Sequence, residues 1–503
     1  MKRVLIANRG EIALRIIRAC HEEGLEAVAV YSAADRLSPH VRAADMAVEI
    51  GPAPASESYL NVQRLIAAAQ HAGADAVHPG YGFLSEREVF AEAVIEAGLV
   101  FVGPPATAIR AMGEKTEARR RMAAAGVPVV PGTTQPLGGV DEAVAAAADV
   151  GYPVMLKAAA GGGGKGMRRA DDAEGLRTAF RAAASEARAA FGDGALYLER
   201  WLEGPRHVEI QVLADTHGTV LHLGERECSV QRRHQKLIEE APSVAVDTDL
   251  RYRMGDAAVR AAQSVGYVGA GTVEFLLEPD GRFHFLEMNT RIQVEHPVTE
   301  MVYGVDLVRE QLRIADGQPT AIAHGPQVPR GHAIECRITS EDPFNGFLPA
   351  TGRVDYLQVP AGPGIRWDAG IEAGSEVGLH YDPLLAKLVA WGETRALAIR
   401  RMGRALGELV VVGVATSQPF HRRVMEEPSF RAGQYDIRYV DQIGAALLDG
   451  GPVAHDLELA AVVAALAEHE RRRAPLPLER HAPADGTSSW MRSVRLGALR
   501  WPR

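Results

Sequence analysis

Three oxygen-bearing side chains, Glu274, Glu287 and Asn289, are spaced so that one β-hairpin can bring them together. They lie in two apolar stretches that are separated by the turn-forming segment EPDGR at 278–282. Side chains alternate between the faces of a strand, so Glu287 and Asn289 share one face and Glu274 on the partner strand can join them. Two carboxylates and an amide oxygen form a site that suits Mg²⁺ with its waters and phosphate oxygens. A polar, solvent-facing side of a strand is the alternative interpretation.

An arginine and a glutamate follow this hairpin directly, in the run TRIQVEHP at 290–297. Arg291 can stabilise negative charge that develops in a transition state, and Glu295 can act as a general base. Such a pair says little by itself. Beside a site for a metal and a nucleotide, it indicates a catalytic pair.

Glycines at 161–164 and at 166 surround Lys165. A loop of this kind lets backbone N–H groups approach an anion closely and leaves the loop free to close over it. It is not a P-loop, because glycine rather than serine or threonine follows the lysine. Lys157, one of only six lysines in the chain, ends the predicted strand before the loop and can place a charge on a phosphate. A flexible linker is the alternative interpretation.

The run QRRHQK at 231–236, with Arg206 and His207 upstream, is rich in hydrogen-bond donors. Such a run can bind phosphate or a small oxyanion. It resembles a nucleic-acid patch as well, but the net charge of -9 and the absence of interleaved aromatic residues argue against nucleic acid as a partner. Arg337, in the predicted strand ECRI, is by itself typical of a structural ion pair.

Strands and helices that alternate over residues 1–113 predict a parallel α/β layer. A Rossmann dehydrogenase also begins in this way, but the first turn here reads NRGE instead of G-x-G-x-x-G. Residues 114–325 carry most of the polar clusters. Residues 330–445 alternate apolar strands with turns, which indicates a separate α+β lobe, and an alanine-rich helix is predicted at 457–472.

Length and composition limit the class of protein. The chain has 503 residues, which favours three or four domains, and its 47% hydrophobic and 24% charged residues are ordinary for a soluble globular protein. No stretch of about 18 apolar residues appears, so we expect no membrane span, and the N-terminus is too charged for a signal peptide. The three cysteines lie far apart without a CxxC pair, which disfavours disulfides or a zinc site and fits the cytoplasm.

Several ordered motifs resemble the biotin carboxylase family over roughly residues 1–445. They are IANRGEIA, HPGYGFLSE, GGGGKGM, RRHQK, EMNTRIQVEHPVTE and GHAIECRI. The resemblance implies an α/β and α+β fold class, in which an ATP-grasp fold is preceded by a Rossmann-like α/β domain and followed by a biotin carboxylase C-terminal lobe. The implied domains are residues 1–113, 114–325 with a mobile lid at 130–203, 326–445, and a helical linker tail at 446–503.

The resemblance also implies roles for individual residues. ATP contacts would come from Lys115, Lys157, Gly162, Gly163, Gly164, Gly166, Glu199, Leu202, His207, His234, Glu274 and Glu287. Mg²⁺ or Mn²⁺ would be held by Glu274, Glu287 and Asn289. Bicarbonate would be held by Lys236, Arg291, Gln293 and Val294, with Glu295 as its base, and biotin would face Tyr81 and Arg337. Arg200 and Trp201 replace a lysine–tyrosine pair of some relatives, so adenine contacts there would use the backbone.

The implied reaction is the ATP-dependent carboxylation of biotin through carboxyphosphate, as the first half-reaction of an acetyl-CoA or propionyl-CoA type of acyl-CoA carboxylase. The family carries biotin on a lysine next to a methionine, and the only such pair here is Met1-Lys2. We therefore expect biotin on a separate carrier protein, carboxyltransferase subunits as further partners, and a homodimer in the cytoplasm. Two alternatives stay open: another ATP-grasp ligase that forms an acyl phosphate, such as a carboxylate–amine ligase, and a nucleotide-binding regulatory subunit without turnover.

Overall fold

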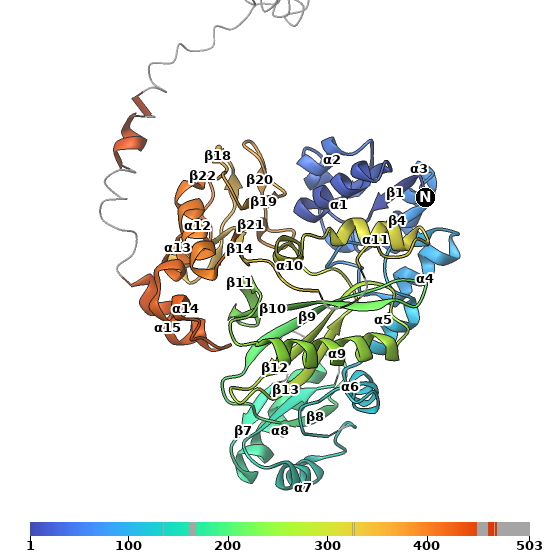
Figure 1. Ribbon diagram of the computed structural model, residues 1–503, viewed down its shortest axis with the longest axis vertical. Helices are drawn as coiled ribbons and strands as arrows, with labels where there is room; N and C mark the ends of the chain where they lie inside the picture. The colour runs from blue at the N-terminus through green and yellow to red at the C-terminus, as the bar shows by residue number, and fades with distance from the viewer. Residues whose placement is uncertain are drawn as a thin grey trace, which may run out of the picture. The chain divides into compact units, whose positions relative to one another are not determined.

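A computed structural model describes residues 1–133, 135–159, 167–323, 325, 327–449, 461–466 and 468–469. The chain divides into two units, residues 1–448 and 449–503. In the second unit, residues 461–466 and 468–469 are helical and fall within the predicted alanine-rich helix. Among the described residues, no helix is both long enough and apolar enough to cross a bilayer. All elements named below belong to the first unit (Figure 1).

The chain begins with a parallel five-stranded sheet in the order β3-β2-β1-β4-β5, which confirms the predicted α/β layer. Its central strand is an apolar run without alternation, and Val4, Leu5 and Ile6 are fully buried, as in strands covered on both faces. The strands are β1 (Arg3–Ile6), β2 (Glu26–Ser32), β3 (Met46–Gly51), β4 (Ala76–His78) and β5 (Val100–Phe101). The helices are α1 (Gly10–Glu22), α2 (Pro39–Ala43), α3 (Val62–Ala72), α4 (Glu88–Glu96) and α5 (Ala106–Gly113).

An antiparallel eight-stranded sheet in the order β13-β12-β9-β10-β11-β14-β21-β19 forms the centre of the molecule. Its strands are β9 (Arg206–Ala214), β10 (Val220–Arg232), β11 (Gln235–Ala241), β12 (Gly269–Leu277), β13 (Phe283–Asn289), β14 (His332–Thr339), β19 (Ile365–Ala369) and β21 (Leu384–Gly392). The sheet joins strands from residues 206–289 to strands from residues 332–392 in the C-terminal lobe. One surface can therefore collect side chains from both.

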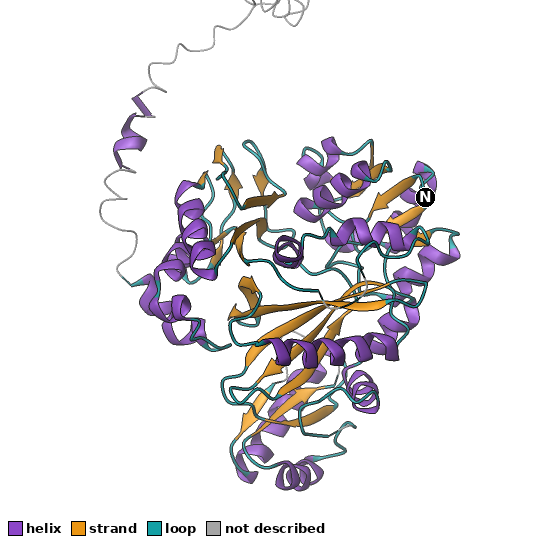
Figure 2. Ribbon diagram, viewed as in Figure 1, coloured by secondary structure: helices purple, strands orange, loops and turns teal. Residues whose placement is uncertain are grey.

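Helices cover both faces of this sheet (Figure 2). They are α9 (Thr248–Ser264), α10 (His296–Tyr303) and α11 (Leu307–Ala315). Val208 and Ile210 of β9 belong to the core that the buried side of α9 completes. Alternation along the strand turns Glu209 and Gln211 to the opposite face, and α10 packs against the neighbouring strands β10, β11 and β14. Polar side chains of β9 therefore lie in a buried layer between the sheet and α10.

A three-stranded sheet in the order β7-β6-β8 forms a smaller layer with a core of its own. Leu156, Leu176 and Leu198 are fully buried in that core. Its elements, with the helix that precedes them, are α6 (Lys115–Ala124), α7 (Val140–Val150), β6 (Val154–Ala158), β7 (Arg168–Ala170), α8 (Ala173–Phe191) and β8 (Leu196–Arg200). A segment with its own core can move as one body, and the elements from α7 to β8 fall within the lid that the resemblance implies.

The C-terminal lobe packs helices on the far end of the eight-stranded sheet. The helix α12 (Arg395–Glu408) contacts β14 and β21, and α13 (Gln418–Glu426) packs on α12 around the buried ring of Phe420. The remaining elements are β15 (Glu341–Asp342), β16 (Leu348–Pro349), β17 (Gly352–Arg353), β18 (Tyr356–Gln358), β20 (Glu376–Val377), β22 (Val410–Val412), α14 (Pro428–Ala432), α15 (Tyr439–Leu448) and the 3-10 turns η1 (Ala33–Asp35), η2 (Ala55–Glu57) and η3 (Pro343–Asn345).

Candidate active site

The hairpin of β12 and β13 brings the three oxygen-bearing side chains together. Glu274 and Glu287 face each other as direct cross-strand partners, and Asn289 pairs with Thr272 one position along the same face. The Asn289 amide donates a hydrogen bond to Glu274 Oε1 at 2.8 Å. Glu274 is buried, whereas Glu287 is exposed to solvent. This set of hard oxygen ligands, open on one side, fits a magnesium ion that also binds phosphate.

Lys236 is the centre of a buried cluster of carboxylates beside the hairpin. Its ammonium donates to Glu209 Oε2 at 2.5 Å, to Glu295 Oε1 at 2.7 Å and to Glu274 Oε1 at 2.9 Å. Burial disfavours the charged amine, but the three carboxylates hold the pKa of Lys236 well above its usual range. The lysine is therefore a fixed cation that joins the proposed metal ligands to the proposed base.

Glu295 is fully buried and is held by two cations, one on each oxygen. Lys236 contacts Oε1, and a guanidinium nitrogen of Arg337 donates to Oε2 at 2.9 Å. Burial opposes ionisation of Glu295, but Lys236, Arg337 and Arg226 keep its pKa well below the usual range. Glu295 is therefore an ionised carboxylate, which is the form a general base requires.

Arg291 lies immediately beyond the hairpin and is held in place by neutral and acidic partners. It donates to Gln293 Oε1 at 2.8 Å, to Asn289 Oδ1 at 3.0 Å and to Glu86 Oε2 at 3.0 Å. Gln293 in turn donates to Glu274 Oε1 at 3.1 Å, and the carbonyl oxygen of Val294 accepts a hydrogen bond from Lys387 at 2.9 Å. Lys236, Arg291 and Gln293 are thus linked around Glu274, whereas the Val294 carbonyl is bound by Lys387.

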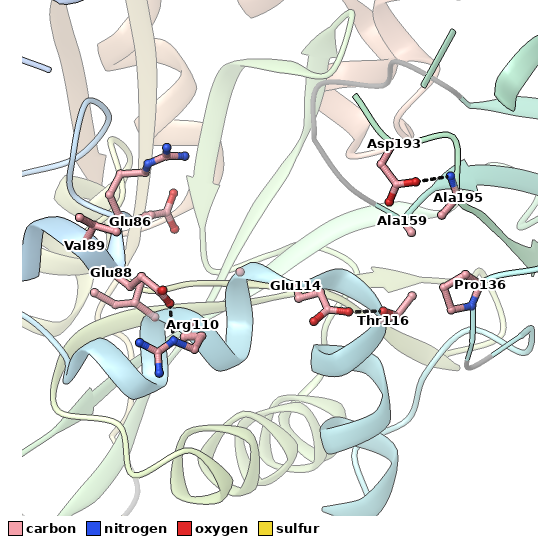
Figure 3. A pocket seen from close by; sticks show the side chains of 13 residues that line it. Glu86, Glu88, Val89, Arg110, Glu114, Thr116, Pro136, Ala159, Asp193 and Ala195 are labelled. Atoms are coloured by element: carbon pink, nitrogen blue, oxygen red, sulfur yellow. Dashed lines mark hydrogen bonds and ion pairs between the residues drawn. The ribbon is translucent and has the colours of Figure 1, made fainter. Parts of the chain in front are cut away.

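A cleft of about 580 Å³ separates the small layer from the N-terminal domain (Figure 3). Figure 3 shows Asp193 and Ala195 of the small layer across from Glu114 and Thr116. Ala159, the last described residue before the glycine loop, lines the same cleft. The loop itself, with Gly162, Gly163, Gly164 and Gly166, lies outside the described residues.

The other residues proposed for ATP lie in several environments. Lys157 of β6 and Arg119 both pair with the buried Glu199 of β8, and Lys115, which begins α6, is among the cations that keep the pKa of Glu199 low despite its burial. Leu202 is buried just after β8. The remaining two are His207 and His234.

These two histidines differ in their surroundings. The ring of His207 on β9 is buried, with Nε2 at 3.0 Å from Glu274 Oε2. Burial disfavours its protonation, but Glu274 raises the pKa of His207 above its usual value. His234 is exposed in the turn between β10 and β11, with φ of 65°. The structure therefore ties His207 to the hairpin carboxylates and leaves His234 at the surface.

The two residues proposed for biotin lie next to a second lysine. The hydroxyl of Tyr81 donates to Glu11, and the fully buried Lys387 pairs with the same carboxylate at 3.1 Å and lies 5.9 Å from the Tyr81 ring centre. Lys387 is the direct cross-strand partner of Arg337. Tyr81 and Arg337 therefore border one polar layer, although they come from different domains.

Several residues of the site escaped the sequence analysis. Arg226 is fully buried and donates to Glu209 Oε1 at 2.5 Å, to Gln211 Oε1 at 2.6 Å and to Thr299 Oγ1 of α10 at 2.9 Å. Glu209 was not predicted either, although His207, Glu209 and Gln211 stand at alternate positions of an apolar strand. That alternation was an available signal for a polar face. Arg226 had no such signal, because its partners come from two other strands and a helix.

Known families match the chain over most of its length. Residues 1–109 match the family described as "Biotin carboxylase, N-terminal domain", and residues 335–442 match "Biotin carboxylase C-terminal domain". Residues 114–322 match "Carbamoyl-phosphate synthase L chain, ATP binding domain". Together the three matches cover both domains that flank the site and the segment that carries it.

Individual proteins are similar over nearly their whole length. The biotin carboxylase of Nostoc sp. is 52% identical over 441 residues, which are 88% of this chain and 99% of the relative. A crystal structure of a biotin carboxylase complex from Campylobacter jejuni has a TM-score of 0.85 at 46% identity, over 88% of this chain and 98% of that one. The biotin carboxylase domain dimer of Hydrogenobacter thermophilus 2-oxoglutarate carboxylase, with MgADP, ADP and bicarbonate, has a TM-score of 0.84 at 45% identity, over 89% of this chain and 98% of that one.

Proposed function

The chain belongs to the biotin carboxylase family, and from that premise we propose that it performs the first half-reaction of an acyl-CoA carboxylase of the acetyl-CoA or propionyl-CoA type. It is an ATP-dependent enzyme that carboxylates biotin. The observation that carries the proposal for the site is the position of Glu295. This buried carboxylate lies between Lys236 and Arg337, and Lys236 also contacts Glu274 of the hairpin.

In the first step, we assign bicarbonate to Lys236, Arg291, Gln293 and Val294. Glu295 removes the proton of bicarbonate, and the resulting oxyanion attacks the terminal phosphorus of ATP in line, which gives carboxyphosphate and ADP. Mg²⁺ or Mn²⁺, when bound by Glu274, Glu287 and Asn289, neutralises charge on the phosphates. We assign the other ATP contacts to the residues that the resemblance implies. The position of His207 next to Glu274 supports the assignment of His207.

The charge balance around Glu295 supports its role as a base. Lys236 and Arg337 hold the pKa of Glu295 low, and a carboxylate with a low pKa accepts a proton poorly. A bicarbonate that pairs with Lys236 competes for one of these cations. Glu295 then becomes a stronger base at the moment when its substrate is present.

In the second step, carboxyphosphate separates into CO₂ and phosphate. The phosphate takes the N1′ proton of biotin, and the ureido anion attacks CO₂ to give carboxybiotin. We assign Arg337 to the oxygen of that anion, because its guanidinium is always charged, and Tyr81 to the ring of biotin. Closure of the lid at 130–203 would keep carboxyphosphate away from water.

We propose four domains for these tasks. Residues 1–113 form one wall of the nucleotide cleft, and residues 114–325 form the ATP-grasp domain. Residues 326–445 form the lobe that faces biotin, and residues 446–503 form a linker tail. Biotin is proposed to arrive on a separate biotin carboxyl carrier protein, and carboxyltransferase subunits to receive it. The dimer of the Hydrogenobacter thermophilus domain supports a homodimer. The three free, buried cysteines fit the cytoplasm as the location.

The test is an ATP cleavage assay with bicarbonate, with and without free biotin. A biotin carboxylase releases ADP faster when biotin is added, a carboxylate–amine ligase ignores biotin, and a regulatory subunit shows no turnover. The variant Arg291→Ala should still bind ATP but lose most of the biotin-dependent cleavage, by about 10²–10³-fold, because a donor to the developing charge is removed. Wild-type turnover in this variant would contradict the assignment of Arg291.

A further inference from the structure

A second cleft, of about 530 Å³, lies between two loops that belong to different domains. One wall is formed by residues 33–38 of the N-terminal domain, and the other by residues 370–378 and 380–382 of the C-terminal lobe. In Figure 1 these walls belong to the blue region around α2 and the orange region around β20. The cleft of Figure 3 is lined by other residues, so these two clefts are separate openings.

The rim of this second cleft carries the two most exposed large apolar side chains of the described residues. Leu37 is 83% exposed and lines the cleft, and Leu379 is 72% exposed between the lining residues Gly378 and His380. A single exposed leucine is ordinary on a protein surface. Two from different domains at the rim of one cleft offer a partner an apolar contact on each wall.

Aromatic side chains connect a wall of the cleft to the loop that carries Tyr81. Two residues later, Phe83 stacks on Tyr59 with ring centres 5.0 Å apart, and it meets Tyr381 of the cleft wall edge-on at 6.2 Å. Tyr381 is held by a hydrogen bond to Ser32 Oγ at 2.6 Å. A molecule in the cleft therefore lies against the same packed unit that positions Tyr81.

A second connection runs through the start of α1. Gly10 lines the cleft, and the next residue, Glu11, accepts the hydroxyl of Tyr81 and pairs with Lys387. The negative charge of Asp382, another lining residue, contributes to the raised pKa of Tyr81 after burial, which is the main cause. The floor of the cleft thus borders the groups that we assign to biotin.

Four charged residues of the walls form two ion pairs. Arg9 forms two hydrogen bonds of 2.7 Å to Asp35 and lies 4.2 Å from the Tyr381 ring centre, and Arg42 pairs with Glu372. The other charged lining residues, Arg36, Glu376 and Asp382, carry charges of both signs, so the walls do not select a ligand of one high charge. Biotin linked to a lysine through an amide is an uncharged, partly apolar arm, and apolar rims suit the protein that carries it.

We propose that this cleft receives the biotin-bearing arm of the carrier protein, and that Leu37 and Leu379 contact the carrier itself. The proposal rests on the proposed function, because it assigns Tyr81 and Arg337 to biotin. ATP then uses the cleft of Figure 3 and the carrier uses the second one. The two substrates need not pass each other, and the lid can stay closed over the nucleotide while the carriers exchange.

The experiment compares free biotin with a biotinylated carrier as substrates of the double variant Leu37→Glu/Leu379→Glu. The carrier domains of an acetyl-CoA, a propionyl-CoA and a pyruvate carboxylase serve as probes, and the one that the wild-type enzyme uses best is kept. We expect KM for this carrier to rise by at least about tenfold, since two apolar contacts are replaced by charges. The kinetics with free biotin should stay at the wild-type level. Val328→Glu is the matched control, because Val328 is an apolar side chain elsewhere on the protein that is 70% exposed. It should leave the kinetics with both substrates unchanged.

Three results would overturn the proposal, and each is distinct from a failure of the proposed function. If the double variant had the same kinetics with the carrier as the wild-type enzyme, this surface would be excluded as the docking site. A sedimentation shift from dimer to monomer, with equal losses for both substrates, would assign the leucines to an interface between two copies of the chain. A wild-type enzyme that carboxylates free biotin but none of the carriers would refute the docking surface and leave the biotin carboxylase assignment intact, whereas no biotin-dependent ADP release at all would refute the assignment itself.

Discussion

Glu239 and Glu240 are neighbours on β11, yet they lie in two buried charge clusters with opposite properties. Burial raises the pKa of Glu239 to about 7, since Arg337 only partly offsets it and Glu295 adds a like charge. Burial also opposes ionisation of Glu240, but the hydrogen bond and charge of His332, followed by Arg395, lower its pKa to about 2. Adjacent residues on a strand face opposite sides, so a single strand separates the two clusters.

The cluster around Glu240 is balanced. Glu240 Oε2 accepts from His332 Nε2 at 2.5 Å and from Arg395 Nε at 2.6 Å, and Oε1 accepts from Arg395 at 3.0 Å and from the hydroxyl of Tyr435. Each oxygen has two donors and each donor has an acceptor. Such a cluster ties β11 to α12 and to the segment before α15, and it leaves nothing for a ligand to bind.

The cluster around Glu239 has more carboxylates than donors. Glu239 and Glu295 share Arg337, and burial together with the nearby Glu239 raises the pKa of Glu335 well above its usual range. Among the described residues, both oxygens of Glu335 and one of Glu239 are buried without a hydrogen-bond partner. Unsatisfied buried groups are costly to stability, so their presence distinguishes a site built for chemistry from one built for stability.

The largest expected effect is that of Glu295→Gln, in the cluster around Glu239, which we call the unbalanced cluster because it has more carboxylates than donors. Bicarbonate-dependent ATP cleavage should fall by about 10²–10⁴-fold, because the amide cannot take the proton of bicarbonate. The midpoint of thermal unfolding should fall less than deletion of the side chain would cause, since the amide keeps the shape and its one oxygen can still accept from Arg337. Both are measured on one preparation. Turnover at the wild-type level would remove Glu295 as the base, and a collapse of stability would make the cluster structural.

The reciprocal change is Glu240→Ala in the balanced cluster. It leaves His332 and Arg395 buried without their carboxylate, and breaking a buried pair in this way costs about 3–5 kcal/mol of the free energy of unfolding. Turnover of the folded enzyme, measured well below its unfolding temperature, should stay close to wild type. Urea unfolding measures the loss. The control Glu408→Ala removes an exposed pair with Arg404 and should cost little. A large loss of turnover with unchanged stability would reverse the assignment of the two clusters.

The sequence revealed the parts of the site that are local in the chain. Glu274, Glu287 and Asn289 lie on one hairpin, and Arg291 and Glu295 follow within a few residues, so strand alternation alone brought them together. The parallel N-terminal sheet followed from the alternation of strands and helices for the same reason. Local patterns are readable because they depend on the period of one element.

No pattern in the sequence predicted the balanced cluster around Glu240. Glu240, His332, Arg395 and Tyr435 come from segments separated by tens of residues. The strand order β11-β14-β21 brings Glu240, His332 and the start of α12 together, and the packing of the segment before α15 adds Tyr435. No periodicity specifies which strand pairs with which. Arg226 escaped for the same reason, since its role depends on β9, β12 and α10 at once. What the sequence lacked was the pairing of distant strands.

The smallest expected effect is a change in how stability depends on pH, tested with Glu239→Gln. The folded pKa of about 7 lies above the usual value of 4.5, so the folded state holds this proton more tightly than the unfolded state. The stability that this proton contributes is complete below pH 4.5 and is lost as pH rises from 4.5 to 7. One such group changes the free energy of unfolding by at most about 1.4 kcal/mol per pH unit. Glu239→Gln should therefore flatten the decline between pH 5 and pH 7 in urea unfolding.

The neighbouring variant Glu240→Gln provides the opposite sign in the same assay. The folded pKa of about 2 lies below 4.5, so the stability contributed by ionised Glu240 is complete above pH 4.5 and is lost as pH falls toward 2. This variant should keep the wild-type slope between pH 5 and pH 7 and lose the slope on the acid side. If both variants changed the pH dependence of the free energy of unfolding in the same pH range, the two faces of β11 would share one electrostatic environment. The contrast between a balanced and an unbalanced cluster would then have to be given up.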